Sequence, residues 1–237
     1  TPHTVYAEPF VGMGGVFFKR DHRPKAEAIN DRSKDVATLF RVLQRHFDAF
    51  LDMLRWQVAS RAEFARLVAC DPDTLTDLER AARFIYLQRL SFGGKVAGRT
   101  FGISTTSSAK FSLGRLIPLL EEAHARLDGV CIECLPWQEF IARWDRPETL
   151  FFIDPPYYGV EGYYGAGLFD RAEFDALSAQ LQQLRGRFIL TLNDHPEVRR
   201  IFGWAKIDAV TLTYTCAGKP TEGREVIITG GDNAIVR

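Results

Sequence analysis

The sequence has few cysteines and no excess of either charge. Its four cysteines are too few and too scattered in 237 residues to form a disulfide framework. Thirty Lys and Arg residues balance thirty Asp and Glu residues, so the net charge points neither to nucleic acid nor to a membrane surface. No apolar stretch approaches the roughly 18 to 20 residues of a membrane span, and no secretory pattern opens the chain. We therefore expect a soluble protein in a reducing, cytoplasmic setting.

What the sequence does contain is an alternation of short apolar runs and amphipathic segments. This pattern occupies the first fifty residues and resumes after about Gly129, as is typical of a parallel α/β sheet. The expected strands are Thr4–Ala7, Glu27–Asn30, Val130–Glu133, Leu150–Ile153 and Phe188–Leu192, followed by a closing hairpin of Ala209–Tyr214 and Glu225–Thr229. A helix is expected over Val36–Phe47 and another after Asp170, where Asp170 and Glu173 resemble a capping box. The predicted fold is α/β, with a doubly wound, mostly parallel sheet.

A long helical segment without strands separates the two parts of the sheet. We expect residues 1–51 and 129–237 to form the sheet domain and residues 52–128 to form an inserted helical subdomain. Between Arg80 and Arg115 lie seven basic residues and no acidic one, interleaved with aromatic, Gly and Ser residues. Such a segment can neutralise the phosphates of a duplex. A solvated helix face followed by a flexible loop would carry the same charges, and basic runs more commonly have that origin. The candidate DNA-binding residues are Arg89, Lys95, Arg99 and Lys110.

The most specific motif is Asp154-Pro155-Pro156-Tyr157, which directly follows an apolar run. In open α/β sheets, ligands bind beyond the carboxyl ends of the strands, where this tetrad would lie. The exocyclic amine of adenine is a poor nucleophile because its lone pair is delocalised into the ring. The Asp154 carboxylate and the Pro155 carbonyl, whose direction the prolines restrict, can accept the two amine hydrogens and localise that pair. Tyr157 offers a face on which an extruded base can stack, so we predict that the whole tetrad is catalytic.

A plain turn or a peptide ligand could also account for this tetrad. Pro-Pro-Tyr can simply connect a strand to a helix, although a turn leaves Asp154 without a role. Residues 155–158 also match the Pro-Pro-x-Tyr pattern that WW domains recognise. Such ligands occur in exposed, Pro-rich tracts, whereas this segment adjoins an apolar strand.

A glycine-rich loop follows the first expected strand and precedes a short helix expected over Val16–Lys19. Its glycines let a ligand approach the backbone, and Asp31 lies 19 residues beyond Gly12, where an acidic residue in such folds accepts hydrogen bonds from ribose hydroxyls. The loop alone is a weak signal, and Asp31 could equally be the N-cap of the next helix. The candidate cofactor-binding residues are Tyr6, Glu8, Pro9, Phe10, Gly12, Gly14, Asp31 and Asp154.

Four motifs taken in order resemble the Dam-type adenine-N6 DNA methyltransferases, particularly those of phages and restriction systems. They are Glu8–Gly12, Ile29–Asp31, Asp154–Tyr157 and Leu192–Asp194, and the segment Tyr86–Gly94 is similar to the family's entry into its DNA-recognising region. The resemblance covers nearly the whole chain. It implies a Rossmann-like fold, S-adenosylmethionine as the methyl donor, no metal, and double-stranded DNA as the partner, with a cognate restriction endonuclease as a further partner.

The resemblance also implies roles for individual residues. Phe10 and the Gly12 loop would contact the cofactor, Asp31 its ribose, and the tetrad the target adenine. Family members carry an upstream Gly-Gly-Lys segment that helps to close the cofactor site, and the motif at Gly93-Gly94-Lys95 is in the wrong place to be it. The chain either follows such a segment or binds its cofactor poorly. An RNA amine methyltransferase and a non-catalytic DNA-binding remnant are the alternative functions.

Overall fold

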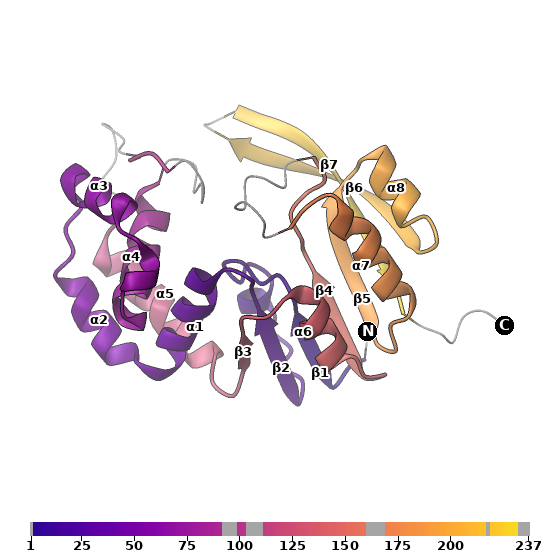
Figure 1. Cartoon of the computed structure of the whole chain (residues 1–237), viewed down its shortest axis with the longest axis horizontal. Helices are drawn as coiled ribbons and strands as arrows, with labels where there is room; N and C mark the ends of the chain where they lie inside the picture. Colours follow the sequence, from indigo (N-terminus) through magenta and orange to yellow (C-terminus); the bar gives the residue numbers. More distant parts are fainter. Residues whose placement is uncertain (1, 92–98, 103–110, 160–168, 217–218, 232–237) are drawn as a thin grey trace. The chain divides into compact units, whose positions relative to one another are not determined.

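The computed structural model describes residues 2–91, 99–102, 111–159, 169–216 and 219–231 (Figure 1). None of the helices in these ranges combines the length and apolar character needed to cross a bilayer. The strands are β1 (Val5–Glu8), β2 (Ala26–Asn30), β3 (Cys131–Glu133), β4 (Thr149–Ile153), β5 (Arg187–Asn193), β6 (Lys206–Cys216) and β7 (Lys219–Gly230). The helices are η1 (Phe17–Lys19), α1 (Lys34–Arg45), α2 (Phe47–Arg55), α3 (Arg61–Ala69), η2 (Pro72–Thr74), α4 (Asp77–Leu90), α5 (Leu113–Arg126), α6 (Trp137–Trp144), α7 (Ala172–Gln182) and α8 (Pro196–Ile201).

The strands form one mostly parallel sheet in the order β3-β2-β1-β4-β5-β7-β6. β1 pairs in parallel with β2 on one side and with β4 on the other, and β4 pairs in parallel with β5. The last two strands are an antiparallel hairpin, and β7 of this hairpin adds antiparallel to β5 (Figure 1). The predicted α/β fold with a mostly parallel sheet is confirmed. The chain leaves β1 toward β2 while β4 lies on the other side, so the carboxyl ends of β1 and β4 form a topological switch point, where open α/β sheets bind ligands.

β5 and β7 carry polar side chains on one face, near the carboxyl ends of the parallel strands. Residues of β5 alternate between a buried face and a half-buried face, and the half-buried face includes Thr191 and Asn193. On β7, Glu225 lies directly opposite Asn193 in the antiparallel register and is also half-buried. The opposite face of the two strands is apolar and belongs to the core, with Phe188, Leu190, Leu192, Val226 and Ile228.

Two local expectations are wrong. The helix predicted through Phe47 ends at Arg45, because His46 has the non-helical angles φ −130° and ψ 34°, and Phe47 begins α2. The capping box predicted before α7 does not form, and the N-cap of this helix is Arg171, without a side-chain cap. Asp170 Oδ1 accepts a hydrogen bond from the Ala172 N–H (2.9 Å), but the Glu173 carboxylate accepts one from the Trp137 ring nitrogen (2.8 Å).

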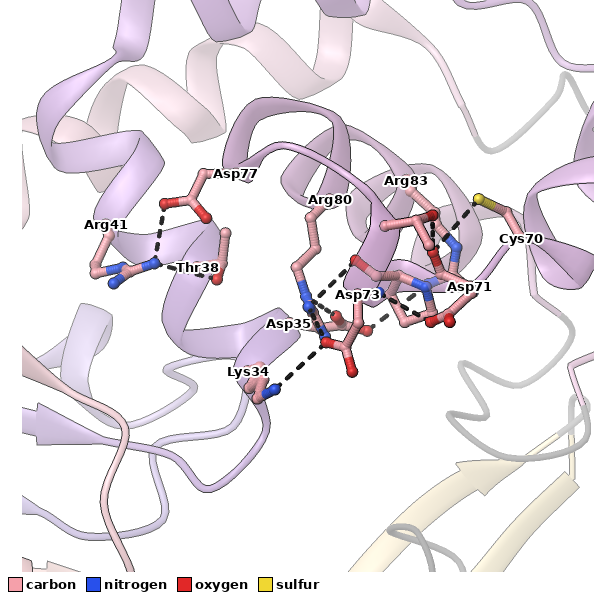
Figure 2. A network of polar contacts seen from close by, with 12 residues as sticks. Lys34, Asp35, Thr38, Arg41, Cys70, Asp71, Asp73, Asp77, Arg80 and Arg83 are labelled. Carbon is pink, nitrogen blue, oxygen red and sulfur yellow. Dashed lines mark hydrogen bonds and ion pairs between the residues drawn. The ribbon is translucent and has the colours of Figure 1, made fainter.

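The chain divides into two compact units, Thr1–Arg32 with Leu135–Arg237, and Ser33–Cys134. The helical unit is therefore longer than the expected insertion of residues 52–128, and it includes α1. α1 packs against α4, and an ion-pair cluster between Asp35, in the first turn of α1, and two arginines of α4 adds to this contact. Arg80 donates through Nε to Asp35 Oδ1 (2.6 Å), and Arg83 Nη1 lies 3.8 Å from Asp35 Oδ2 (Figure 2). Because Asp35 and Arg80 lie 45 residues apart along the chain, periodicity could not predict their contact.

Candidate active site

The loop after β1 is shaped by two glycines and by the residue that follows β2. Gly12 and Gly14 have φ angles of 51° and 73°, in the left-handed region that favours glycine. A Cβ atom on Gly14 would also lie 2.4 Å from the Phe18 ring. The Gly12 N–H donates to Oδ2 of Asp31 (2.9 Å). Asp31 thus adjoins the loop, and the N-cap of α1 is Ser33 rather than Asp31.

A buried amide, whose role the sequence did not reveal, holds this loop in place. Asn30 is 1% exposed; its Nδ2 donates to the carbonyl oxygens of Pro9 (2.9 Å) and Leu135 (3.2 Å). Its Oδ1 accepts from the Leu135 N–H (2.8 Å), and its own carbonyl accepts from the Val11 N–H (2.9 Å). One side chain therefore ties the loop after β1 to the segment after β3. The only sequence signal is an amide at the end of an apolar strand.

Tyr6 and Glu8 lie on the same face of β1, and each is 2% exposed. The Tyr6 hydroxyl donates to Glu8 Oε1. The Arg20 guanidinium lies over the Tyr6 ring, with 3.4 Å between the guanidinium carbon and the ring centroid, and donates to Glu27 Oε1 (3.1 Å). Burial, together with the Glu8 carboxylate, raises the pKa of Tyr6 above its usual range. Tyr6 therefore keeps its proton and acts as a fixed donor to Glu8.

Phe10 contributes an aromatic ring to the loop after β1. Its ring is half-buried and lies 5.6 Å from the ring of Phe169 and 6.3 Å from that of Trp137, between centroids. Pro9, beside it, is buried. A planar ring next to a glycine loop and a carboxylate is a set of groups suited to a nucleoside.

Asp154 follows β4, and its carboxylate is exposed to solvent, whereas Pro155 and Pro156 are buried. The Thr191 hydroxyl on β5 donates to Asp154 Oδ1 (2.7 Å). Among the residues that the structure describes, none donates to Oδ2 of Asp154 or to the carbonyl oxygen of Pro155. The surrounding protein removes hydration from the carboxylate and raises the pKa of Asp154; the bond from Thr191 opposes this shift and the charge of Glu225 adds to it. Two acceptors thus lie side by side in the chain with capacity for further hydrogen bonds.

The two tyrosines after the prolines are held from β5 and β7. Tyr157 is half-buried, and its hydroxyl donates to Glu225 Oε1 (2.5 Å). Asn193 clamps the next residue, because its Oδ1 accepts from the Tyr158 N–H (2.9 Å) and its Nδ2 donates to the Tyr158 carbonyl (3.0 Å). The ring of Tyr158 lies 4.6 Å from that of His195, between centroids. Asn193 lies in one of the family motifs, which did not predict its contact with Tyr158, and the sequence carries no signal for Thr191 or Glu225.

The structure therefore gathers the predicted cofactor and catalytic residues at one edge of the sheet. The glycine loop follows β1, Asp31 follows β2 and the tetrad follows β4, and these three strands are adjacent and parallel. The described residues include no group of three or more His, Cys, Asp or Glu side chains that could hold a metal ion.

Some arginines of the basic stretch make contacts within the helical unit, although the charge of the stretch alone suggests DNA binding. Arg80 bridges Asp35 and Asp73 with its side chain 13% exposed (Figure 2). Arg83 donates through Nε to the Leu67 carbonyl (2.8 Å). These two arginines are structural. Arg89 is half-buried, and its Nε is buried without a hydrogen-bond acceptor among the described residues.

Of the other three proposed DNA contacts, the structure describes only Arg99. Arg99 is half-buried beside Phe84, with 5.6 Å between its guanidinium carbon and the ring centroid, and burial next to Arg83 lowers its pKa. Lys95 and Lys110 lie outside the described residues.

Comparisons with known proteins identify the family of this chain. The chain is 27% identical to the Type II methyltransferase M1.LlaDCHI of Lactococcus lactis subsp. cremoris, over 96% of this chain and 87% of the relative. It is 18% identical to the Type II methyltransferase M.CviBI of Paramecium bursaria Chlorella virus NC1A, over 84% of this chain and 76% of that one. A solved precorrin 8w decarboxylase of Methanobacterium thermoautotrophicum shares 12% identity at a TM-score of 0.37, covering 97% of this chain and 82% of that one. Residues 2–215 match the D12 class N6 adenine-specific DNA methyltransferases, and the chain belongs to that family.

Proposed function

We propose that this adenine-N6 DNA methyltransferase takes its methyl group from S-adenosylmethionine, acts on double-stranded DNA, and carries out the transfer at Asp154. The observation that supports this most strongly is the state of the Asp154 carboxylate. It is exposed at the switch point of the sheet, one oxygen is held by Thr191, and the other accepts from no described residue. A carboxylate so placed can accept a hydrogen bond from a substrate without losing its own orientation.

The groups around the loop after β1 fit S-adenosylmethionine, which supplies a methyl group on a sulfonium whose C–S bond breaks on transfer. The glycine backbone at Gly12 and Gly14 allows close approach, the Phe10 ring provides an apolar face, and Asp31 can accept from ribose hydroxyls. Tyr6, Glu8 and Pro9 are all buried and would act indirectly, by holding the loop through the bond between Tyr6 and Glu8 and through the hydrogen bonds of Asn30.

The tetrad would prepare the amine for attack. Asp154 Oδ2 and the Pro155 carbonyl accept the two hydrogens of adenine N6, which localises the lone pair and directs it away from the ring plane. Once N6 has formed its new N–C bond it carries a positive charge and must lose one proton. Asp154, with its raised pKa, can accept that proton and pass it to water. Pro156 keeps the preceding carbonyl in a fixed direction.

Tyr157 would hold the adenine outside the duplex. Base flipping costs a few kcal/mol, and stacking on an aromatic ring returns about 1–3 kcal/mol per base. The half-buried ring of Tyr157 follows Pro155, the second acceptor, by two residues in the chain.

The helical unit would contact the DNA backbone. Arg80 and Arg83 are engaged in ion pairs with Asp35, and we propose that Arg89 and Arg99 instead neutralise phosphates together with Lys95 and Lys110. Because the two relatives are named Type II methyltransferases, we further propose that the modification protects DNA from an endonuclease that cuts the same sequence.

Asp154→Ala and Asp154→Asn test the central assignment. Methyl transfer from labelled S-adenosylmethionine to DNA should fall by at least about 100-fold in both variants, because neither retains a carboxylate to accept from N6. Calorimetric binding of S-adenosylhomocysteine should stay within about threefold of the parent, since cofactor contacts are centred on the other loop. Near-parent transfer by either variant would sink the assignment. Methylation of RNA rather than duplex DNA by the parent would instead support the alternative substrate.

A further inference from the structure

We propose that Glu225 is a positioning residue for methyl transfer, which holds the Tyr157 ring in the orientation in which it receives the flipped adenine. The inference deepens the proposed function and rests on the stacking role that it gives to Tyr157. Glu225 lies on β7, a strand of the antiparallel hairpin, and is not part of the tetrad.

The contact between the two side chains is a short, charge-assisted hydrogen bond. The Tyr157 hydroxyl donates to Glu225 Oε1 at 2.5 Å, and both side chains are half-buried. Hydrogen bonds from a hydroxyl to a carboxylate are among the stronger kinds in proteins. A tyrosine has two side-chain torsions, and anchoring the far end of the ring restricts both. The ring plane is therefore set before any base arrives.

The register of the sheet places a second contact with the same loop directly opposite Glu225. Asn193 and Glu225 lie directly opposite each other on β5 and β7. Asn193 bonds both the N–H and the carbonyl of Tyr158, while Glu225 bonds the side chain of Tyr157. Two facing residues thus fix two consecutive residues of the loop, one by its backbone and the other by its ring.

A third residue of the same face completes the arrangement. Thr191 precedes Asn193 by two residues, so the two side chains leave β5 on the same face, and Thr191 bonds the Asp154 carboxylate. Asp154, Tyr157 and Tyr158 are each held from β5 or β7. A loop that contains two prolines, and therefore few backbone N–H donors, gains its order from these side chains.

The experiment compares variants that remove the tether from either end. Tyr157→Phe removes the hydroxyl and keeps the ring, Glu225→Ala removes the acceptor, and Glu225→Gln keeps an acceptor oxygen without the charge. The target sequence is first mapped from the methylation pattern of DNA in cells that express the protein. The readouts are kcat, KM for duplex DNA, and the fluorescence of 2-aminopurine placed at the target adenine. Glu139→Ala, on an exposed glutamate of α6 paired with Arg143, is the matched control.

We expect Tyr157→Phe and Glu225→Ala each to lower kcat about tenfold and to reduce the 2-aminopurine signal, because a mobile ring stacks the flipped base less well. The double variant should be no slower than either single variant, since both remove one and the same interaction. Glu225→Gln should retain at least about half of the parent kcat, and Glu139→Ala all of it. Tyr157→Phe changes one hydroxyl group, so it tests the tether even if Glu225→Ala fails to fold.

Contrary outcomes separate this inference from the proposed function. Parent kcat in Tyr157→Phe and Glu225→Ala, or losses that multiply in the double variant, would overturn the positioning role. If Asp154→Ala is inactive in the same assay, the proposed function stands and only the role of Glu225 fails. If Asp154→Ala transfers methyl groups at the parent rate, the proposed function itself is wrong.

Discussion

Thr191 donates a hydrogen bond of 2.7 Å to Oδ1 of Asp154, across the parallel pair of strands β4 and β5. This bond orients the carboxylate, and it also favours the charged form, which opposes the rise in the Asp154 pKa that comes from loss of hydration. A hydroxyl on one strand therefore controls both the direction and the protonation of an acid on the loop after the neighbouring strand.

Replacing this hydroxyl should slow the reaction without unfolding the protein. Thr191→Val is nearly isosteric and leaves Asp154 without its donor, so we expect kcat to fall about tenfold or more at pH 7. Thr191→Ser keeps the donor and should stay within about threefold of the parent. Labelled methyl transfer at saturating DNA and S-adenosylmethionine checks both values, and equal rates for the Val and Ser variants would contradict the role.

The pH dependence of kcat should carry the signature of a raised pKa. Protonated Asp154 cannot accept the amine hydrogen in the proposed way, so activity is lost as the pH falls through its pKa. Partial loss of hydration and the Glu225 charge raise that pKa, which moves the acidic limb above the ordinary aspartate value of about 3.9. Glu225→Gln removes one of the raising causes and should shift the limb to lower pH. A parent limb centred near pH 4 would contradict the prediction.

Two glycines of the loop after β1 should differ in their tolerance of a methyl group. Gly12→Ala meets no atom within 4 Å but adopts a positive φ, which costs about 1 kcal/mol. Gly14→Ala has the same backbone cost and also forces the Phe18 ring to move. We therefore expect Gly14→Ala to weaken S-adenosylhomocysteine binding and lower the melting temperature more than Gly12→Ala. Calorimetry and thermal unfolding measure both, and the reverse order would show that the ring yields freely.

Arg80 should matter for stability rather than for DNA. Arg80→Ala leaves Asp35, 19% exposed, without its closest cation and should lower the free energy of unfolding by about 2 kcal/mol. Arg66→Ala, which removes an exposed pair with Glu63, should cost about 0.5 kcal/mol or less. Urea denaturation of the two variants provides the comparison, and equal losses would mean that the Figure 2 cluster contributes little.

Arg89 and Arg99 should behave in the opposite way. Each, if it meets one phosphate, should lower the slope of log affinity against log salt by about 1 when replaced by alanine, with the unfolding midpoint little changed. Fluorescence anisotropy of duplex DNA between about 50 and 200 mM salt measures this slope. Unchanged slopes in both variants would place the DNA surface elsewhere.

The sequence predicted most strands and the order of the motifs because each depends on local pattern. Short apolar runs bounded by breakers located β4 and β5 to within a residue at each end, and the residue types of the tetrad indicated the chemistry. What it could not predict are contacts between residues far apart in the chain. Asn30 bonds Leu135 and Tyr157 bonds Glu225, over separations of 105 and 68 residues. No periodicity encodes such pairs.

The helical unit shows that ion pairs between distant residues are also not predictable from the sequence. A run of basic residues without acidic neighbours suggests an open cationic surface, yet Arg80 and Arg83 meet Asp35, which lies well outside the run. Composition within a window cannot show whether a charge is neutralised by a residue from another helix. Of the four predicted DNA contacts, Arg89 and Arg99 lie within the described residues and stay predictions.

The hairpin near the end of the chain has a practical consequence for protein engineering. The match to the family ends at residue 215, before β7 begins at Lys219. A shortened version cut at that limit would retain every motif by which the family is identified. It would nevertheless lose β7, the strand that pairs with β5, and with it Glu225, which accepts the hydrogen bond of the Tyr157 hydroxyl. We therefore expect the shortened protein to be inactive.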